Sequence, residues 1–426
     1  MSMNTSKFAL ALAVALPLAP IAARADDAPA APTKWSDTLK LGAQIEAGIA
    51  GNPAGPKDNL NYGSLYTDRA NEPVINQILL SIGRPLDPKA TSYDFGFKVQ
   101  GLYGTDARYT HFAHLFDSFT RGRYQPAINE ASVSLHTPWL TEGGVDYQAG
   151  LYPTLLGYET IDTSTNPFYS HSYIYNFGLP VNHAGGNAIW HATGNVDIYL
   201  GVDAGNQTIP GEDNNGSAAF IAGTKLTFLD GNFTLLALTH FGPENASRYV
   251  KANFTGNLNA NNYNRAYNDV LITYKANEKL TFTTEANYVA EDLGAQQGKK
   301  IKSAEAFGLA QYASYALTDT WTANMRAEVF SDTRSFFVAG YPTAKGPIAA
   351  VEGLPYAAVT GTGRNTYGAL TVGATYKPEM PEFAKSVVAL IRPEARIDSV
   401  MNGNARYNGG KDRTQYTLSA DLVLTY

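Results

Sequence analysis

The sequence predicts an all-β protein, a transmembrane antiparallel β-barrel of about sixteen strands with long loops at one end and short turns at the other. Three observations lead to this fold class. Apolar and polar residues alternate in segments along most of the chain. The turn-rich connections between these segments are alternately short and long, and no internal segment could form a membrane helix. Because a strand points alternate side chains to opposite faces, each run has one apolar and one mainly polar face.

The first 25 residues have the pattern of an export signal. Lys7 supplies a positive charge, residues 8–21 carry no charge, and Ala23-Arg24-Ala25 is a small-x-small cleavage pattern, which places cleavage after Ala25. An uncleaved anchor is the alternative, but the apolar run is too short for a helix to cross roughly 30 Å of hydrocarbon. Residues 26–34 are rich in alanine and proline and should be a flexible lead-in to a barrel domain at 35–426.

The strands follow in order, and the last one shows the alternation most clearly. Residues 416, 418, 420, 422, 424 and 426 are apolar or tyrosine, whereas 417, 419, 421 and 425 are polar. The same alternation predicts strands that include residues 39–47, 93–100, 196–203, 280–288, 321–329 and 389–398. The most apolar internal stretches, 235–238 and 387–391, are far shorter than the roughly 18 residues of a spanning helix.

Short and long connections alternate between these strands. Short turns include residues 87–89, 141–144, 194–195, 230–232, 277–279 and 318–319. Long polar connections lie at about 51–72, 103–127, 153–186, 205–216, 243–263, 292–302, 333–364 and 399–412. Such an arrangement is typical of outer-membrane barrels, and eight long connections with about seven turns give the strand count, with fourteen or eighteen strands as alternatives.

Composition excludes several classes of protein. Cysteine is absent, so disulfides, thiol nucleophiles and thiolate metal sites are ruled out. A net charge of −6 with 16% charged residues argues against nucleic-acid binding, which needs a basic surface. A soluble β-sandwich or propeller is the alternative to the barrel, but the chain shows no blade-like repeat and ends within a strand on Tyr426.

Charged residues within the strands should face the barrel interior. An Arg or Lys facing lipid near mid-bilayer costs about 2–4 kcal/mol, and a barrel this wide holds water. The predicted pore-lining residues are Lys98, Glu285, Arg326, Glu328, Arg392, Glu394 and Arg396. The arginines share one arc of wall, and two interpretations stay open: a net basic patch that selects ions, or salt bridges that only stiffen the wall.

The connection at 153–186 is unusually aromatic for a loop in solvent. We expect it to fold into the barrel mouth and narrow it; packing over the rim is the alternative. Its candidate constriction residues are Glu159, Asp162, Asn166, Tyr169, His171 and Tyr173. The connection at 333–364, with Phe336, Phe337, Tyr341, Pro355 and Tyr356, could cap the barrel in the same way.

The same region resembles a known family. Residues 165–180 (TNPFYSHSYIYNFGLP) and 183–186 (HAGG), preceded by 149–153 (AGLYP) and 157–159 (GYE), are similar to the signature block of the OmpL-like β-barrel porins. The resemblance implies an outer-membrane pore for passive diffusion of small hydrophilic solutes or ions. Tyr426 resembles the C-terminal aromatic signal read by the barrel-assembly machinery, although Phe is commoner there.

Two other classes remain as alternatives: an outer-membrane barrel enzyme of the lipid-hydrolase type, and a non-conducting structural or adhesin barrel. Ser170-His171-Ser172 suggests hydrolysis but has no evident carboxylate partner. His111 and His114, near Asp106 and Asp117, are better explained as solvated loop histidines than as metal ligands. We therefore predict no enzyme activity, no cofactor and no metal. The expected partners are outer-membrane lipid, the barrel-assembly machinery and small hydrophilic solutes, with a homotrimer as an analogy to general porins.

Overall fold

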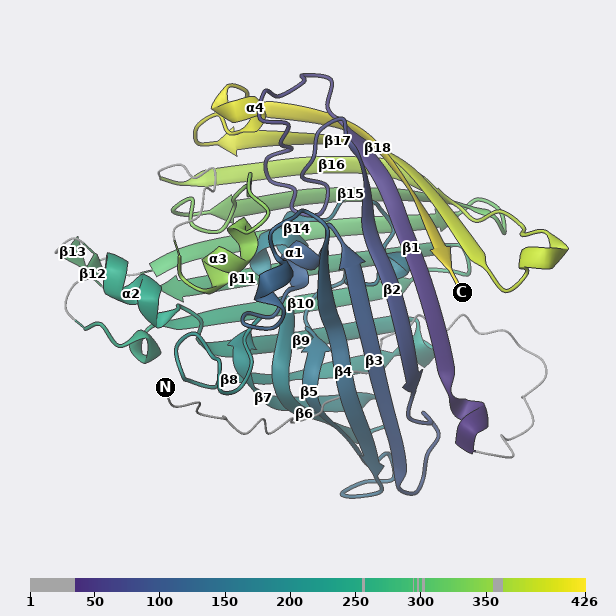
Figure 1. Ribbon diagram of the computed structural model, residues 1–426. Helices are drawn as coiled ribbons and strands as arrows, with labels where there is room; N and C mark the ends of the chain where they lie inside the picture. Colours follow the sequence, from purple (N-terminus) through teal and green to yellow (C-terminus); the bar gives the residue numbers. More distant parts are fainter. Residues whose placement is uncertain (1–34, 255–256, 294, 297–298, 301–302, 355–362) are drawn as a thin grey trace.

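The computed structural model describes residues 35–254, 257–293, 295–296, 299–300, 303–354 and 363–426 (Figure 1). The predicted export signal at 1–25 and the lead-in at 26–34 lie outside the described residues.

The described chain forms one closed barrel of sixteen antiparallel strands, which confirms the predicted fold class. Each strand pairs with its neighbours in sequence, and β1 pairs with β18 to close the cylinder. The barrel strands are β1 (Lys40–Gly51), β2 (Pro73–Arg84), β3 (Asp94–Gly104), β4 (Gln125–Thr137), β5 (Val145–Pro153), β6 (Asn182–Thr193), β7 (Val196–Asn206), β8 (Ala219–Phe228), β9 (Phe233–Pro243), β10 (Asn264–Lys275), β11 (Leu280–Asp292), β14 (Ser303–Ala316), β15 (Trp321–Asp332), β16 (Asn365–Tyr376), β17 (Val388–Asn402) and β18 (Thr414–Thr425).

The connections contain short helices and one small β-hairpin. They are η1 (Trp35–Thr38), α1 (Ala107–Thr110), η2 (Asp117–Phe119), η3 (Thr163–Thr165), η4 (Ile174–Gly178), η5 (Leu229–Gly231), α2 (Ser247–Asn253), η6 (Ala260–Asn262), the β12–β13 hairpin (Ala295–Gln296 and Lys299–Lys300), α3 (Gly346–Val351), η7 (Glu382–Ala384) and α4 (Tyr407–Gly410). Among the described residues, no helix combines the length and the apolar character needed to cross a membrane.

The alternation read from the sequence sets the two faces of the wall. In β18, Tyr416 and Leu418 are about 60% exposed, whereas the intervening Thr417 and Ser419 are 6% exposed or less. Large apolar residues point outward on other strands as well; examples are Leu41, Leu80, Phe95, Leu200, Phe220, Phe307, Met325, Leu370 and Val372. An apolar outside and a polar inside are the arrangement that a membrane requires of a barrel.

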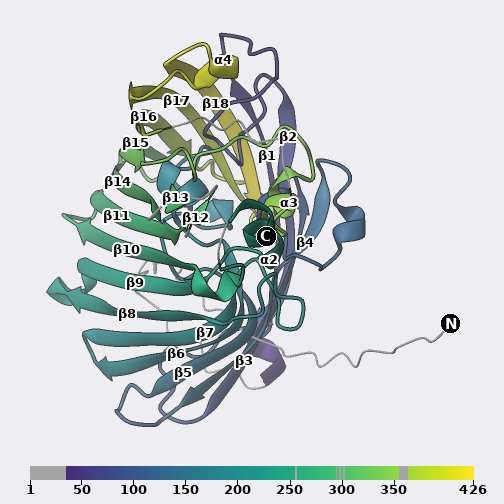
Figure 2. The ribbon, with the colours of Figure 1, turned by 90° about the vertical axis from the view of Figure 1, so that its left-hand side faces the viewer.

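The two ends of the barrel differ as predicted. The long connections, with α2, α3, α4 and the β12–β13 hairpin, gather at one end, and the C-terminus lies toward the other (Figure 1). Figure 2 views the molecule toward this long-connection end, where α2 and α3 lie in front of the ring of strands. The connections that reach inside the ring are therefore the ones that can shape its interior.

Candidate functional site

Residues 154–181, which join β5 to β6, fold into the interior of the barrel. Their backbone carbonyls accept hydrogen bonds from the side chains of Gln77 on β2, Asn287 on β11 and Arg392 on β17, at 2.8, 2.9 and 2.6 Å. These strands belong to separate parts of the wall, so the segment crosses the interior. We call residues 154–181 the inner loop.

Glycines on the wall let the inner loop approach closely. A β-carbon added at Gly308 of β14 would lie 2.5 Å from Cγ1 of Ile174, and one at Gly48 of β1 would lie 2.6 Å from Cζ of Tyr169. The aromatic ring of Tyr173 stacks on Tyr367 with the centroids 5.3 Å apart. A hydrophobic core joins the loop to the β14–β16 wall, and the same core reaches Tyr199, Leu236, Leu238 and Tyr267 on β7, β9 and β10.

Arg326 of β15 is the central ionic anchor of the inner loop. Its Nη1 donates to Oε1 of Glu159 and to the carbonyl of Ser170, both at 2.7 Å, and its Nε donates to Oε1 of Glu328 at 2.7 Å. The side chain is fully buried. Arg396 of β17 extends the network, since its Nη1 donates to the same Glu328 oxygen at 2.7 Å.

Arg392, which lies four residues before Arg396 on β17, is a second anchor of the inner loop. Its Nη1 donates to the carbonyls of Thr163 and Asn166 at 2.6 and 2.7 Å. The rest of its guanidinium pairs with Asp421 of β18 and Glu46 of β1. The arginine therefore joins the closing strands of the barrel to the tip of the inner loop.

The predicted interior charges all lie on the inner face, but the loop covers most of them. Arg326, Glu328, Arg392, Glu394, Arg396 and Glu285 are each at most 6% exposed, while the side chain of Lys98 is 26% exposed and pairs with Glu130 at 2.8 Å. The predicted net basic patch is wrong, because carboxylates outnumber the arginines here. Those carboxylates are Glu46, Glu159, Glu328, Glu394, Asp398 and Asp421.

Each remaining loop residue that the sequence singled out has a defined contact. The Tyr169 hydroxyl donates to Oδ1 of Asn76 at 2.9 Å, the Tyr173 hydroxyl donates to Oδ1 of Asp398 at 3.1 Å, and Oδ1 of Asp162 accepts from the backbone of η3. Glu394 and Glu285 accept backbone N–H groups of the loop. Sequence reasoning missed Glu46 and Asp398 as partners, although both lie in the polar phase of their strands.

The carboxyl of Glu159 is held ionised. Burial by itself would raise its pKa, but the Arg326 guanidinium and the His171 ring, together with the Ser172 N–H, lower the pKa to about 2. The His171 Nδ1 lies 2.8 Å from Oε2 of Glu159. The loop therefore carries a charged anchor at ordinary pH.

The residues that suggested hydrolysis do not form a nucleophile–base pair. Among the described residues, the Ser170 hydroxyl accepts from Arg326, the Ser172 hydroxyl accepts from the Tyr175 N–H, and His171 pairs with Glu159. The prediction of solvated loop histidines is wrong for His111, which is 1% exposed and whose Nε2 lies 2.9 Å from Asp117, whereas the side chain of His114 is 42% exposed.

Two cavities flank the inner loop on the side of β5 to β10. The outer cavity, of about 360 Å³, is lined by Phe177 and Leu179 of the loop, by Tyr66 and Tyr109, and by Arg265. The inner cavity, of about 470 Å³, lies beside the short turns. Its lining includes Leu155, His136, Asp146, His191, Asp197, Tyr199 and Lys225.

The comparisons with known proteins agree with this architecture. Residues 38–426 match the family described as "Putative beta-barrel porin-2, OmpL-like". No curated protein matches the chain in sequence.

Several solved structures share the fold at low sequence identity. The outer membrane channel DcaP of Acinetobacter baumannii is 10% identical with a TM-score of 0.53, over 91% of this chain and 96% of that one. An anion-selective porin from Comamonas acidovorans is 9% identical with a TM-score of 0.52, over 91% and 99%. OmpF of Salmonella typhi, in a complex with daunomycin, is 11% identical with a TM-score of 0.55, over 92% and 99%. At these identities the likeness concerns the fold alone.

Proposed function

Because this chain belongs to the OmpL-like β-barrel porin family, we propose that its barrel is an aqueous channel for passive diffusion of small hydrophilic solutes and ions across the bacterial outer membrane. The observation that carries the proposal is the polar inner wall of a closed sixteen-stranded barrel. Barrels of this size are too wide for their own side chains to fill, so the interior holds water. The inner loop then sets how wide the water path is.

The path runs between the inner loop and the wall of β5 to β10. On the opposite wall, Arg326, Arg392 and Arg396 are sealed beneath the loop by ion pairs. The outer and inner cavities both lie on the β5–β10 side and both touch loop residues. Leu179 borders the outer cavity and Leu155 the inner one, and both pack in the hydrophobic core, so a solute would pass between the cavities only where this packing opens.

Charges of both signs line the inner cavity along this path. The side chain of Lys225 lies close to that of Asp197, which in turn contacts His191. These three side chains are 25%, 22% and 32% exposed, respectively. The carboxylates of the lining (Asp87, Glu142, Asp146 and Asp197) outnumber its lysines (Lys89 and Lys225), so we expect a weak preference for cations and for polar over apolar solutes.

Export and assembly belong to the same proposal. The signal at 1–25 would direct the chain out of the cytoplasm, and Tyr426 would present an aromatic end to the barrel-assembly machinery. The Tyr426 side chain is 64% exposed, and its backbone pairs with Ala43 of β1. A homotrimer in outer-membrane lipid stays a prediction by analogy.

The test is single-channel recording in planar lipid bilayers, with the mature protein refolded in detergent without a tag. We expect stepwise openings and a small reversal potential in a KCl gradient. Lys225→Glu should shift the reversal potential toward cations, because the side chain lines the inner cavity. Lys251→Glu, on the exposed surface of α2, is the matched control and should leave the potential unchanged.

Absence of openings from a folded barrel would overturn the proposal. Lipid hydrolysis by that same silent preparation would then favour the enzyme alternative, and a silent barrel without hydrolysis would favour an adhesin or structural role.

A further inference from the structure

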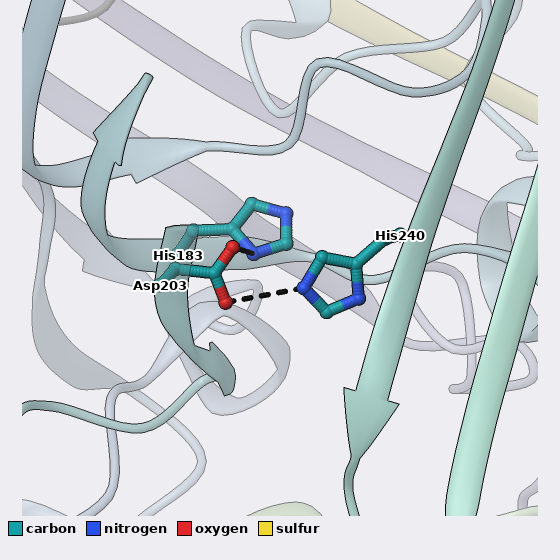
Figure 3. Close-up of side chains that lie close together, drawn as sticks. All are labelled: His183, Asp203 and His240. Atoms are coloured by element: carbon teal, nitrogen blue, oxygen red, sulfur yellow. Dashed lines mark hydrogen bonds and ion pairs between the residues drawn. The ribbon is translucent and has the colours of Figure 1, made fainter. Parts of the chain in front are cut away.

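A second cluster of ionisable side chains lies outside the inner-loop network, near the long-connection end of the wall. His183 of β6, Asp203 of β7 and His240 of β9 bring their side chains together, and all three are 0% exposed (Figure 3). The two imidazole rings lie next to each other with their centroids 4.7 Å apart, and each points a nitrogen toward a different oxygen of the carboxylate. Three groups of this kind sealed from water need an explanation.

Hydrogen bonds do not satisfy the cluster. The Nε2 of His240 lies 3.1 Å from Oδ1 of Asp203 and can bond to it. The Nδ1 of His183 lies only 3.3 Å from Oδ2 of Asp203, yet within the described part of the chain neither atom has a hydrogen-bond partner. Buried polar atoms without a partner are costly and call for a missing ligand, ion or water.

The spacing of the donor atoms suits a cation. Tetrahedral zinc sites have metal–nitrogen and metal–oxygen bonds of about 2.0–2.2 Å, which places neighbouring donors about 3.3–3.5 Å apart. The Nε2 of His240 lies 3.1 Å from Oδ1 and the Nδ1 of His183 lies 3.3 Å from Oδ2 of Asp203, both close to this edge length but on different carboxylate oxygens. One ligand atom from each of the three residues lies within 4.8 Å of the other two.

On the side away from Asp203, the His183 ring has a hydrogen-bond partner, whereas the His240 ring faces a carboxylate beyond direct hydrogen-bond distance. The Nε2 of His183 lies 3.2 Å from the Thr154 hydroxyl, and the Nδ1 of His240 lies 3.6 Å from Oε1 of Glu244. A histidine that binds a metal through one nitrogen commonly gives its other N–H to a hydroxyl, carbonyl or carboxylate, which fixes the ring. Glu244 is itself held by the Asn206 N–H at 2.9 Å.

Another histidine–aspartate cluster in the barrel shows what a cluster held by hydrogen bonds looks like. His136 lies 2.6 Å from Asp146, and His191 lies 3.1 Å from Asp146 and 2.7 Å from Asp197. His191 is also partly open to the inner cavity. Direct hydrogen bonds account for these contacts, in contrast to the buried pair of His183 and Asp203.

We propose that His183, Asp203 and His240 form a binding site for a divalent transition-metal cation of the zinc type. Two imidazole nitrogens and one carboxylate oxygen are donors that Zn²⁺ accepts, and they exclude a calcium site, which needs oxygen ligands alone. The cation would cross-link β6, β7 and β9. It could enter from the outer cavity, whose lining includes Glu244 and Asn206 next to the site. The proposal does not depend on conduction.

The experiment uses the untagged mature protein, refolded in detergent and stripped with EDTA. Zn²⁺ is titrated calorimetrically, and bound metal is measured by elemental analysis after dialysis. We expect one zinc per chain in the wild type, and an affinity at least about 100-fold lower in His183→Ala, His240→Ala and Asp203→Asn, since even the outer partners of a metal site are worth 10–100-fold.

Two controls locate the metal. His191→Gln removes a histidine from the hydrogen-bonded cluster, and His114→Ala breaks the partly exposed group of His114, Asp117 and Glu352, whose ligand atoms also lie close together. Both variants should retain one zinc per chain. Loss of zinc in either of them, with retention in the His183 variant, would overturn the assignment.

A measurement on the wild type alone guards against variants that fail to fold. Co²⁺ in a tetrahedral nitrogen–oxygen site gives a visible absorption band, which should appear on addition of Co²⁺ and disappear when Zn²⁺ is added. A folded wild-type barrel that binds no zinc and shows no such band contradicts the proposal.

Discussion

At the scale of the residue, the interior is organised by buried charges that neutralise one another. The side chain of Arg326 is completely buried and forms ion pairs with Glu159 and Glu328. Such a pair adds little to stability compared with apolar packing, but removal of one partner leaves a buried charge unbalanced and costs about 3–5 kcal/mol. The arginines therefore specify where the inner loop sits.

The pH dependence of this anchor follows from Glu159. Its pKa of about 2 in the folded protein lies below its ordinary value of 4.5, so its ionised form stabilises the fold fully above pH 4.5. That stabilisation, on the order of 3 kcal/mol at most, is lost as the pH falls from about 4.5 towards 2. We expect wild-type conductance to be constant from pH 7 to 5 and to change below pH 4, as the loop loosens.

Glu159→Gln tests this expectation in single-channel recordings and in urea unfolding followed over pH. The variant should be less stable than the wild type at pH 7. Its stability and conductance should change much less than those of the wild type between pH 4 and 2. Glu212→Gln, at an exposed position of an outer connection, is the control and should keep the wild-type profile. An unchanged profile in Glu159→Gln would show that another group controls the loop.

At the scale of the element, the position of the inner loop depends on shape as well as charge. Gly308 of β14 leaves room for Ile174, and a β-carbon there would lie 2.5 Å from its Cγ1. Gly308→Val should displace the loop toward the β5–β10 wall without altering any charge, because packed interiors do not absorb extra methyl groups. We expect smaller or more variable conductance steps and a loss of about 1–3 kcal/mol in stability.

Gly101→Val on β3 is the matched variant, because a β-carbon at Gly101 meets nothing within 4 Å. Both variants should show the same β-sheet circular dichroism, and only Gly308→Val should change the conductance. Equal conductance in the two would mean that the loop does not border the water path.

At the scale of the whole molecule, stability depends on the match between an apolar outer face and lipid. Leu200 lies in the middle of β7 with 60% of its surface exposed on the outside. Leu200→Arg should destabilise the barrel in lipid vesicles by about 2–4 kcal/mol, whereas Leu200→Phe should be tolerated. Denaturant unfolding in vesicles measures both, and equal stability of the two variants would contradict a lipid-facing position.

The sequence by itself determined the class of fold and the two faces of each strand. Alternation has a period of two residues and is a local property, so Leu418 outside and Ser419 inside could be predicted without knowing any partner strand. The long connections and short turns were predictable for the same reason. The sequence also placed the charged residues on the inner face, because a charge in lipid is costly wherever the strand pairs.

Only the tertiary structure decided which inner residues meet. Glu159 and Arg326 are 167 positions apart, and the arginines form no net basic patch because the loop, β1 and β18 bring carboxylates to the same place. His183, Asp203 and His240 likewise converge from three strands with no spacing that marks them in the chain. Strand register, barrel closure and the fold of the inner loop set these contacts. They are properties of the assembled cylinder, and no local pattern of residues encodes them.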